Sequence, residues 1–565
     1  MFPSTILAAA LLGLAAPQQT PAPPAPANGI RLVVVIAVDQ MIPEQLDRLA
    51  PWTTGGLARF RERGWVLSDA ALEHGVTETG PGHACLGTGC HPLHHGLRAN
   101  SWWSLSAQRS VYCVEDPDVA VVTPDGPARE RPYAGRGRSP RNLLRPGLAD
   151  FLKQAFPGSR AFSVCCKDRA AIGLSGKHPD LAVWWDRQGA TGFVSSTWYA
   201  EALPDWLAAW DRGWVDDLLQ GPFGGGWVAS FEGALEGSGT AVDDRPGESG
   251  RSRSFPHGLP HLSEPPGPRE IGALAAMVYD SPIGDAFALE VAARAVDELE
   301  LGADEQPDLL AIGLSACDTV GHAYGPYSRE VTDVVLRLDR GLGELFDALD
   351  ERVGEDRWVA VLSADHGVLP LPENADAPGG PGERVAGDVV HKAFEAVGMD
   401  LRERFGEDFG MRVVERGLVF SPAEVTAAGI DPAELEGAAA ALLLEHGGDW
   451  IEAVWTKSQL RAVAAGGAGA KVADLLRFEA NSFVEDATPD VVFTPAPRHL
   501  LGLQTGTTHG TPHDYDRRVP LCFFGPGFAP GRTAGRAASV DAVPTLLDRL
   551  GIAIPPGLDG VVLRP

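Results

Sequence analysis

The stretch Leu32-Val-Val-Val-Ile-Ala-Val38, followed by Asp39, decides the predicted fold. An uninterrupted apolar run rich in β-branched side chains is typical of a parallel strand that is buried on both faces of a sheet. Further short apolar runs have the same character, at residues 161–164, 309–314, 358–362 and 519–524. We therefore expect several buried parallel strands.

Amphipathic helical segments lie between some of these runs. The clearest extends from Ser328, a predicted N-cap, to Val353, with apolar side chains recurring on one helical face. Strands that alternate with such helices predict an α/β fold, with a mostly parallel central sheet and helices on both of its faces.

Two regions depart from this alternation of strands and helices. Residues 180–270 are rich in Trp, Gly and Pro, and residues 375–499 are helical and Ala-rich. We expect the first to be an insertion over one face of the sheet and the second to be a cap subdomain. The main domain would then consist of residues 30–374 and 500–565.

Composition excludes several classes of protein. The chain has 565 residues, and 75 Asp and Glu against 47 Lys and Arg give a net charge of −28. Such a surface repels nucleic acids and anionic lipids, so we expect neither a structural nucleic-acid partner nor a membrane surface. Beyond the N-terminus, no apolar run reaches the roughly 18 residues of a membrane helix. An anionic substrate would need a locally positive site.

The N-terminus has the pattern of an export signal. An apolar run at residues 5–16 ends in small residues, which predicts a signal peptide at 1–16, a Pro-rich linker at 17–29 and a periplasmic or secreted protein. The segment before the run has no Lys or Arg, so a disordered apolar tail is the alternative. Seven cysteines do not make a disulfide scaffold, and their odd number leaves at least one without an intramolecular partner.

Three of the predicted strands lead to an aspartate, namely Asp39, Asp318 and Asp365. Because the carboxyl ends of parallel strands meet at one edge of a sheet, we expect these carboxylates to lie close together. Any one of them alone would be interpreted as a helix cap. Three buried together would repel one another strongly unless cations lay between them.

Histidines accompany these aspartates. His322 lies one helical turn after Asp318, His366 directly follows Asp365, and His509 lies in a Thr-Thr-His-Gly segment. Mixed oxygen and nitrogen donors suit zinc, and a pair of metal ions suits phosphoryl transfer. The remaining candidates receive a structural interpretation, as a lone histidine is more often structural: His74, His83, His91, His94, His95 and His513.

A candidate nucleophile lies in the segment Thr77-Glu-Thr79-Gly-Pro-Gly-His83. A hydroxyl before this Gly/Pro turn could sit at a helix N-terminus, where free amides and the helix dipole favour an anion. Taken alone, however, a threonine before a helix is usually only a cap.

In their order along the chain, these motifs resemble the alkaline phosphatase superfamily, and most closely its phosphate-irrepressible alkaline phosphatases with a threonine nucleophile. The resemblance covers most of residues 30–370 and 500–565. It rests on the following motifs: Val-Asp39-Gln, Thr-x-Thr79-x-Pro-x-His, His-Gly-Leu-Arg-Ala-Asn100-Ser-Trp-Trp, Lys167-Asp-Arg169, Asp318-x-x-x-His322, Ser-Ala-Asp365-His366-Gly and Thr-Thr-His509-Gly.

The resemblance implies a zinc-dependent phosphate monoester hydrolase that acts on small phosphate esters through a phosphothreonine intermediate on Thr79, with the main domain as catalytic domain. One of two Zn²⁺ ions would be held by Asp318, His322 and His509. The other would be held by Asp39, Asp365, His366 and the Thr79 oxygen. Asn100, Lys167 and Arg169 would bind the phosphoryl oxygens, and a strand would direct the latter two side chains to one face.

Related activities remain as alternatives. A nucleotide pyrophosphatase/phosphodiesterase resembles the chain in the Thr79 segment and the metal ligands, but that family lacks the Lys-x-Arg pair. A sulfatase would need Cys-x-Pro-x-Arg, whereas Cys90-His-Pro-Leu-His94 ends in histidine. No specific motif in the sequence supports a mutase or a phosphonate hydrolase. An exported non-catalytic metal-binding module would be expected to lack some of the ligands or the nucleophile. The leaving group and the oligomeric state are not indicated.

Overall fold

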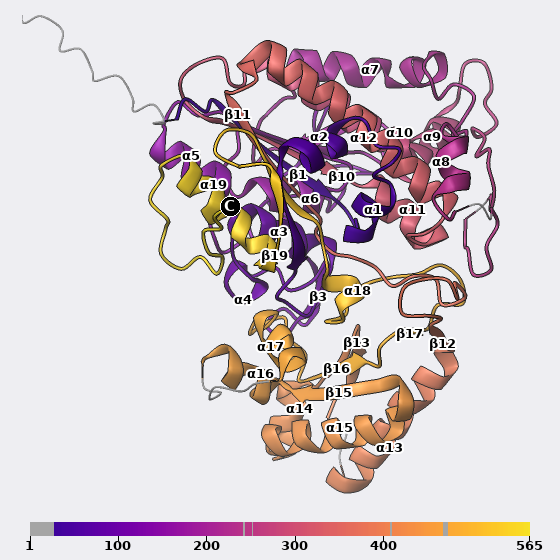
Figure 1. Ribbon diagram of the computed structural model, residues 1–565. Coiled ribbons are helices and arrows are strands. Elements are labelled where there is room, and N and C mark those ends of the chain that lie inside the picture. Colours follow the sequence, from indigo (N-terminus) through magenta and orange to yellow (C-terminus); the bar gives the residue numbers. More distant parts are fainter. Residues whose placement is uncertain (1–27, 241–242, 251, 407–408, 467–472) are drawn as a thin grey trace, which may run out of the picture.

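The computed structural model describes residues 28–240, 243–250, 252–406, 409–466 and 473–565. The predicted signal peptide and nearly all of the predicted linker therefore lie outside the described residues. The described chain forms a large body built on one sheet and a smaller body, drawn in orange, beside it (Figure 1).

The large body has the expected α/β architecture, on an eleven-stranded mixed sheet. Its strands, in spatial order, are β19 (Gly531–Ala538), β2 (Trp65–Ala71), β18 (Leu521–Phe524), β11 (Trp358–Ser363), β1 (Leu32–Val38), β10 (Asp308–Leu314), β7 (Ala161–Cys165), β8 (Leu181–Trp185), β9 (Phe193–Ser196), β5 (Val121–Thr123) and β6 (Gly126–Ala128). The five strands from β11 to β8 are mutually parallel.

Outside this parallel centre, strand direction differs from the prediction. The apolar run that forms β18 was expected to be parallel, but β18 is antiparallel to both β11 and β2. That expectation was wrong because an apolar run reports burial on both faces and not strand direction. Within the predicted insertion at 180–270, β8 and β9 belong to the main sheet, so only the part after β9 lies outside it.

Helices cover both faces of the sheet. The side chains of β1 point alternately to the two faces, and on each face they pack with helices in a separate apolar core. One face carries α2 (Gly56–Arg63), α7 (Asp205–Gln220), α9 (Pro268–Tyr279), α10 (Pro282–Glu298) and α12 (Arg329–Leu349). The other carries α3 (Thr79–Thr88), α5 (Leu148–Ala155), α6 (Asp168–Ser175) and α19 (Ala542–Arg549). Ser328 caps α12 as predicted, since its side chain accepts a hydrogen bond from the Val331 amide.

Shorter elements complete the large body. They are the helices α1 (Pro43–Arg48), α4 (Pro92–His95), α8 (Glu232–Gly237), α11 (Ala316–Tyr324) and α18 (Asp514–Arg517), and the hairpin β3 (Ser101–Ser104)–β4 (Arg109–Tyr112). Among the described residues no helix is long and apolar enough to cross a membrane. All seven cysteines are buried and free, so none of them forms a disulfide.

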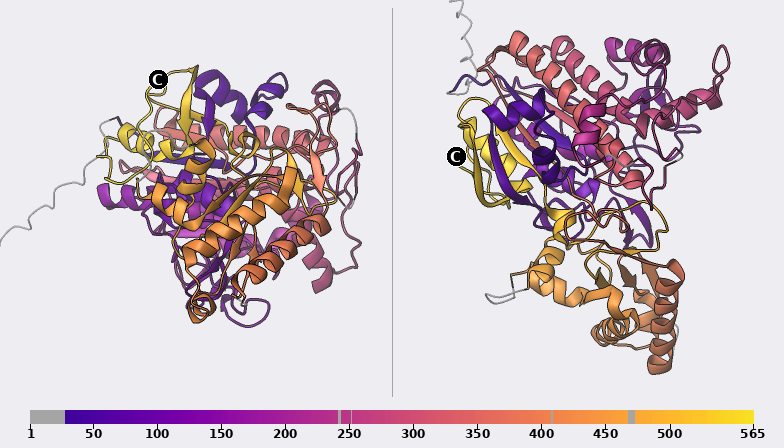
Figure 2. Two further views of the ribbon diagram at one scale, coloured as in Figure 1. Left: turned by 90° about the horizontal axis from the view of Figure 1, so that it is seen from below. Right: turned by 45° about the vertical axis from the view of Figure 1, so that its right-hand side comes forward.

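The smaller body, which we call the cap, has its own four-stranded sheet and apolar core. Its sheet runs β13 (Arg412–Val414), β14 (Gly417–Val419), β16 (Val491–Pro495), β15 (Ile451–Thr456), and its helices are α13 (Gly387–Phe405), α14 (Pro422–Ala427), α15 (Pro432–Gly447), α16 (Lys457–Ala464) and α17 (Asp474–Asn481). The parallel pair β12 (Glu383–Val385) and β17 (His499–Leu501) lies where the chain enters and leaves it. Figure 1 and the right-hand view of Figure 2 show the cap at one end of the large body.

A buried carboxylate of α12 caps the neighbouring helix α2. The two oxygens of Asp339 accept hydrogen bonds from the amides of Thr54, Gly55, Leu57 and Ala58 at 2.8–3.2 Å. We expect Asp339→Ala to lower the free energy of unfolding by about 2–4 kcal/mol, because it leaves several buried amides without an acceptor. Urea unfolding measures this change. Asp347→Ala, on the same helix but with a side chain 81% exposed, is the control and should change stability by less than about 0.5 kcal/mol.

Candidate metal centre and nucleophile

The four neighbouring strands β11, β1, β10 and β7 bring the predicted site residues to one edge of the sheet. Asp39 directly follows β1, and Asp365 lies two residues after β11. Asp318 lies in the first turn of α11, which follows β10, and Lys167 lies between β7 and α6. The strand ends therefore place these side chains together, as expected for an open parallel sheet.

One cluster consists of Asp39, Asp365 and His366, all fully buried. The His366 Nε2 atom lies 3.4 Å from Asp39 Oδ1 and 3.3 Å from Asp365 Oδ2. The His366 Nδ1 atom lies 3.0 Å from the Gly367 carbonyl, which holds the proton on Nδ1 and leaves the Nε2 lone pair for the cluster. Within the described part of the chain, Asp39 Oδ1 and His366 Nε2 have no hydrogen-bond partner.

The second cluster consists of Asp318, His322 and His509. The Nε2 atom of His322 lies 3.2 Å from Asp318 Oδ1, and that of His509 lies 3.6 Å from the same oxygen. Both rings direct Nδ1 to a backbone carbonyl, that of Thr507 at 2.8 Å and that of Thr77 at 2.7 Å. The rings of His366 and His509 stack with centroids 3.5 Å apart, so the two clusters are adjacent.

Burial sets the electrostatics of the three carboxylates. It raises the pKa of Asp39, and the neighbouring charge of Asp365 raises it further. Burial also opposes the ionisation of Asp318, but the charges of His322 and Lys167 outweigh it and hold the pKa well below its ordinary value. Three carboxylates in so small a buried space therefore require positive charge between them.

The donor sets fit metal cations. Each cluster offers one or two carboxylates and one or two imidazole Nε2 atoms whose lone pairs converge. In the first cluster, the buried Asp39 Oδ1 and His366 Nε2 atoms face one another, and neither has a hydrogen-bond partner among the described residues. Mixed carboxylate and imidazole donors are typical of zinc. Each cluster can thus hold one ion.

Thr79 is the first residue of α3 and is buried beside these clusters. The Arg169 Nη2 atom lies 3.4 Å from the Thr79 hydroxyl. The Asn100 side-chain oxygen accepts a hydrogen bond from the Gly80 amide at 2.7 Å. The backbone amide of Asn100 donates to the Glu78 carboxylate. The hydroxyl therefore lies at a helix N-terminus, as predicted, with a guanidinium next to it.

The structure corrects the sequence-based placement of Lys167 and Arg169. Because β7 ends at Cys165, Lys167 is the N-cap of α6 and Arg169 lies in its first turn, so they do not share a strand face. The Lys167 Nζ atom lies 2.5 Å from carboxylate oxygens of both Asp39 and Asp318. The ammonium group thus offsets one of the two negative charges, whereas Arg169 reaches the Thr79 hydroxyl.

Sequence reasoning missed other residues of the site. Gln40 binds both clusters, with its amide 3.0 Å from Asp365 Oδ1 and its side chain 2.6 Å from Asp318 Oδ1. His83, predicted to be merely structural, places Nδ1 3.0 Å from the Thr79 carbonyl and 3.1 Å from Asp365 Oδ2. The signals available in the sequence were that Gln40 directly follows Asp39 and that His83 lies within the Thr79 segment.

The hairpin β3–β4 contributes a residue that no motif indicated. The Tyr112 hydroxyl bonds to the Asp168 carboxylate and lies 3.4 Å from Arg169 Nη1. Arg138 also binds Asp168, at 2.6 Å. These contacts hold the guanidinium of Arg169 next to Thr79.

Two cavities adjoin the centre. One, of about 260 Å³, is bounded by both the cap and the large body and reaches His509; Arg98, Glu415, Phe493 and Leu500 line it as well. The other, of about 210 Å³, lies on the side of Lys167 and Asp168 and is also lined by Tyr133, Arg138 and Tyr279. Both are large enough to admit parts of a small molecule.

Gly82 lets α3 approach the end of β11. A Cβ atom at this position would lie 2.0 Å from the Asp365 carbonyl oxygen, so no larger residue fits without moving the backbone. We expect Gly82→Ala to lower the free energy of unfolding by about 1–3 kcal/mol. Thermal unfolding measures this change. The matched control is Gly272→Ala in α9, where a Cβ would meet no atom within 4 Å and stability should be unchanged or higher.

Comparisons with known proteins agree with this geometry. Residues 33–380 match the family described as type I phosphodiesterase/nucleotide pyrophosphatase. The chain is 32% identical over 538 residues to alkaline phosphatase PhoK of a Sphingomonas species, covering 93% of this chain and 89% of that one. It is 29% identical over 541 residues to alkaline phosphatase PhoV of Synechococcus elongatus, covering 94% and 92% respectively.

The fold is also found in a solved structure. The crystal structure of alkaline phosphatase PafA superimposes with a TM-score of 0.83 at 26% identity, covering 96% of this chain and 99% of that one. A solved variant of PafA, with a threonine, an asparagine, a lysine and an arginine replaced, superimposes with a TM-score of 0.82 at 25% identity.

Proposed function

We propose that this chain, which belongs to the type I phosphodiesterase/nucleotide pyrophosphatase family, is an alkaline phosphatase that hydrolyses phosphate monoesters with two zinc ions and a phosphothreonine intermediate. The observation that carries the proposal is the meeting of two adjacent Asp/His clusters with a buried threonine and a guanidinium. Relatives named as alkaline phosphatases, similar over nearly the whole chain, support it.

The residues that would hold the ions are those of the two clusters. Asp318, His322 and His509 would hold one zinc ion, and Asp39, Asp365, His366 and the Thr79 oxygen the other. When bound, the ions supply positive charge that lowers the pKa of a coordinated hydroxyl and stabilises developing negative charge. Two divalent ions against three carboxylates leave a net charge of about +1, which suits an anionic substrate.

The residues of the chain then act in two displacements. The Thr79 hydroxyl gives its proton to solvent and its oxygen attacks phosphorus in line, so that the bond from Thr79 to phosphorus forms as the bond to the leaving alcohol breaks. The leaving oxygen takes a proton from water. Water next attacks the phosphothreonine, which releases inorganic phosphate and restores the Thr79 hydroxyl.

Arg169, Asn100 and Lys167 would bind the oxygens of the phosphoryl group. Arg169 is already 3.4 Å from the Thr79 hydroxyl, and its fork of donors matches two oxygens of a phosphate. Asn100 Oδ1 accepts the Gly80 amide proton, so the side-chain NH₂ group would be the neutral donor to the phosphoryl group. The Lys167 ammonium lies beside both clusters. The four residue types replaced in the PafA variant are the same as Thr79, Asn100, Lys167 and Arg169, which supports grouping them.

The second candidate is diester or pyrophosphate hydrolysis, which the family match favours. A monoester dianion carries two negative charges, whereas a diester carries one. Once ions occupy the clusters and engage Asp39 and Asp318, Lys167 would join Arg169 in supplying two positive charges at the phosphoryl position, which favours the monoester. We therefore place monoesters first and expect diesters to be poorer substrates.

Replacing the nucleophile tests the chemistry. We expect Thr79→Ala to lower kcat for para-nitrophenyl phosphate by about 10³-fold or more, because no oxygen remains to form the covalent intermediate. Metal content, measured by mass spectrometry, should stay near that of the wild type, since the Asp and His ligands remain. Thr79→Ser is the matched control and should retain a substantial part of the activity. Full activity of Thr79→Ala would refute the assignment.

Replacing the two cations tests substrate preference. We expect Lys167→Ala and Arg169→Ala each to lower kcat/KM for para-nitrophenyl phosphate by about 10²–10³-fold, and for its bis ester by much less, because the diester carries one charge fewer. Lys153→Ala and Arg564→Ala, which remove surface ion pairs, are the controls and should leave both rates unchanged. Equal losses on the two substrates would contradict the argument from charge.

A further inference from the structure

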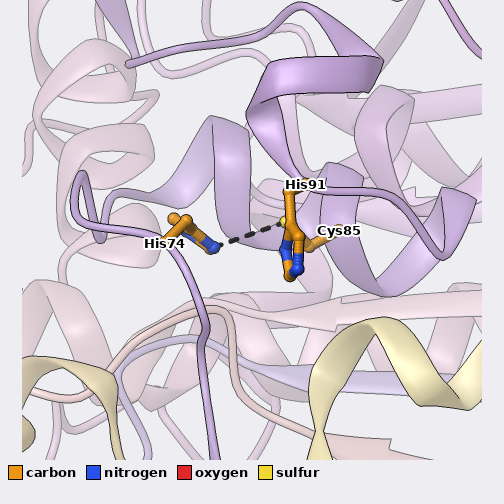
Figure 3. A group of neighbouring side chains, drawn as sticks. All are labelled: His74, Cys85 and His91. Carbon is orange, nitrogen blue, oxygen red and sulfur yellow. Dashed lines mark hydrogen bonds between the residues drawn. The ribbon is translucent and has the colours of Figure 1, made fainter. Parts of the chain in front are cut away.

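A third group of possible metal ligands lies apart from the two Asp/His clusters. It consists of His74, in the segment between β2 and α3, Cys85 on α3 and His91, the N-cap of α4 (Figure 3). One ring nitrogen of each histidine and the Cys85 sulfur all lie within 4.8 Å of one another. The closest of these pairs is Cys85 Sγ and His74 Nδ1, at 3.5 Å.

Two buried nitrogen atoms of this group are unsatisfied. His74 and Cys85 are fully buried, and among the described residues neither His74 Nε2 nor His91 Nδ1 has a hydrogen-bond partner. Leaving such atoms buried and unpaired costs about 1–3 kcal/mol each, and a cation bound to the two rings would remove this cost at each ring atom that it coordinates.

Hydrogen bonding within the group does not satisfy all of its atoms. The Cys85 sulfur lies 3.5 Å from His74 Nδ1, and a thiol has a single proton to donate, and only weakly. Among the described residues, His91 Nδ1 is left without a partner. A cation would use all three donors.

His95 completes the surroundings of the sulfur. Its Nδ1 accepts the Leu97 amide proton at 3.1 Å, so the neutral ring carries its own proton on Nε2, which lies 3.5 Å from Cys85 Sγ. His95 therefore donates to the sulfur and stabilises a thiolate without being a ligand. Asp559, which accepts from the His91 amide at 2.7 Å, adds negative charge nearby.

We propose that His74, Cys85 and His91 form a third metal site, which binds a thiophilic d¹⁰ cation, Zn²⁺ or Cu⁺. Two imidazoles and one thiolate are donors that both ions favour, whereas Mg²⁺ and Ca²⁺ prefer oxygen. On binding, the Cys85 thiol gives up its proton to solvent, and the metal–sulfur bond takes its place.

The site would be structural. Two of its ligands are fully buried, and it ties the segment before α3, α3 itself and the start of α4 together. Cys85 and Thr79 belong to the same helix, so the ion would help to hold the helix that carries the nucleophile. The proposal does not depend on the proposed function, because none of its ligands belongs to the two Asp/His clusters.

Cobalt spectroscopy tests the site on the whole protein. The chain is stripped of metal with a chelator and reloaded with Co²⁺ as a substitute for Zn²⁺. The two Asp/His clusters have only oxygen and nitrogen donors, so a sulfur-to-cobalt charge-transfer band in the near ultraviolet reports a thiolate ligand. A parallel anaerobic titration with Cu⁺ against a competing chelator tests the other ion.

We expect the wild type to bind one metal ion per chain in a Cys85-dependent manner in at least one of these two experiments. The experiment that shows this binding identifies the ion. Cys85→Ala should abolish that signal and His74→Gln should weaken it. Cys522→Ala, which removes a buried thiol of β18, is the control and should keep the signal. Circular dichroism checks that each variant is folded.

Wild-type protein that shows neither a sulfur-to-cobalt band nor a tightly bound Cu⁺ overturns the proposal, whatever the variants do. A signal that persists in Cys85→Ala overturns it as well. Loss of phosphatase activity in Thr79→Ala has no bearing on this outcome, so the third site and the proposed function can fail separately.

Discussion

The burial of three carboxylates at one edge of the sheet is the constraint on which the rest of the site depends. β1 lies between β10 and β11, and the three strands pair in register, Val38 beside Leu314 and Ala37 beside Ser363. The chain therefore delivers Asp39, Asp318 and Asp365 to neighbouring positions. Helices on both faces exclude water, and the repulsion between the carboxylates is then relieved by positive charge, which Lys167, His322 or bound cations can supply.

The same constraint explains why the surrounding backbone is arranged as it is. A ligand histidine must present a lone pair, and each of the three rings does so because a carbonyl fixes its Nδ1 proton. Thr77 serves twice, since its carbonyl accepts from His509 and its hydroxyl donates to the Thr511 carbonyl at 2.9 Å. The Thr79 segment and the chain returning from the cap thus hold one another in place.

The cap takes part in this arrangement through a few polar contacts. Arg416 binds Glu479 within the cap at 2.6 Å and the Gly75 carbonyl of the large body at 3.1 Å. The Asn481 side chain donates to the Glu73 carbonyl at 2.6 Å. These contacts end on the segment that leads to Thr79, so the cap supports the loop before the nucleophile.

The sequence predicted the parts of the structure that follow from local rules. Apolar runs report buried strands, and carboxylates at their ends report an edge, so Asp39, Asp318 and Asp365 could be brought together without coordinates. Strand direction could not, because the antiparallel β18 has the same apolar pattern as a parallel strand. Lys167 was misplaced because β7 ends two residues before it.

Other parts depend on contacts between distant segments. Tyr112 reaches Asp168 from a hairpin that carries no motif, and no spacing in the sequence indicates this contact. His74 and His91 were interpreted as structural one by one, and no role was predicted for Cys85, since each residue is unremarkable alone. Only the fold shows that the segment before α3 and the start of α4 bring two histidines to one cysteine.

Net charge and local charge then have to be reconciled. A surface of −28 opposes the approach of a phosphate dianion, the proposed substrate, yet salt screens such a field beyond about 8 Å at physiological ionic strength. Inside the centre, water is excluded and charges interact more strongly. In the proposed function, Arg169, which contacts Tyr112 and Asp168, and Lys167 would therefore decide binding locally. The acidic surface would not set what the site accepts.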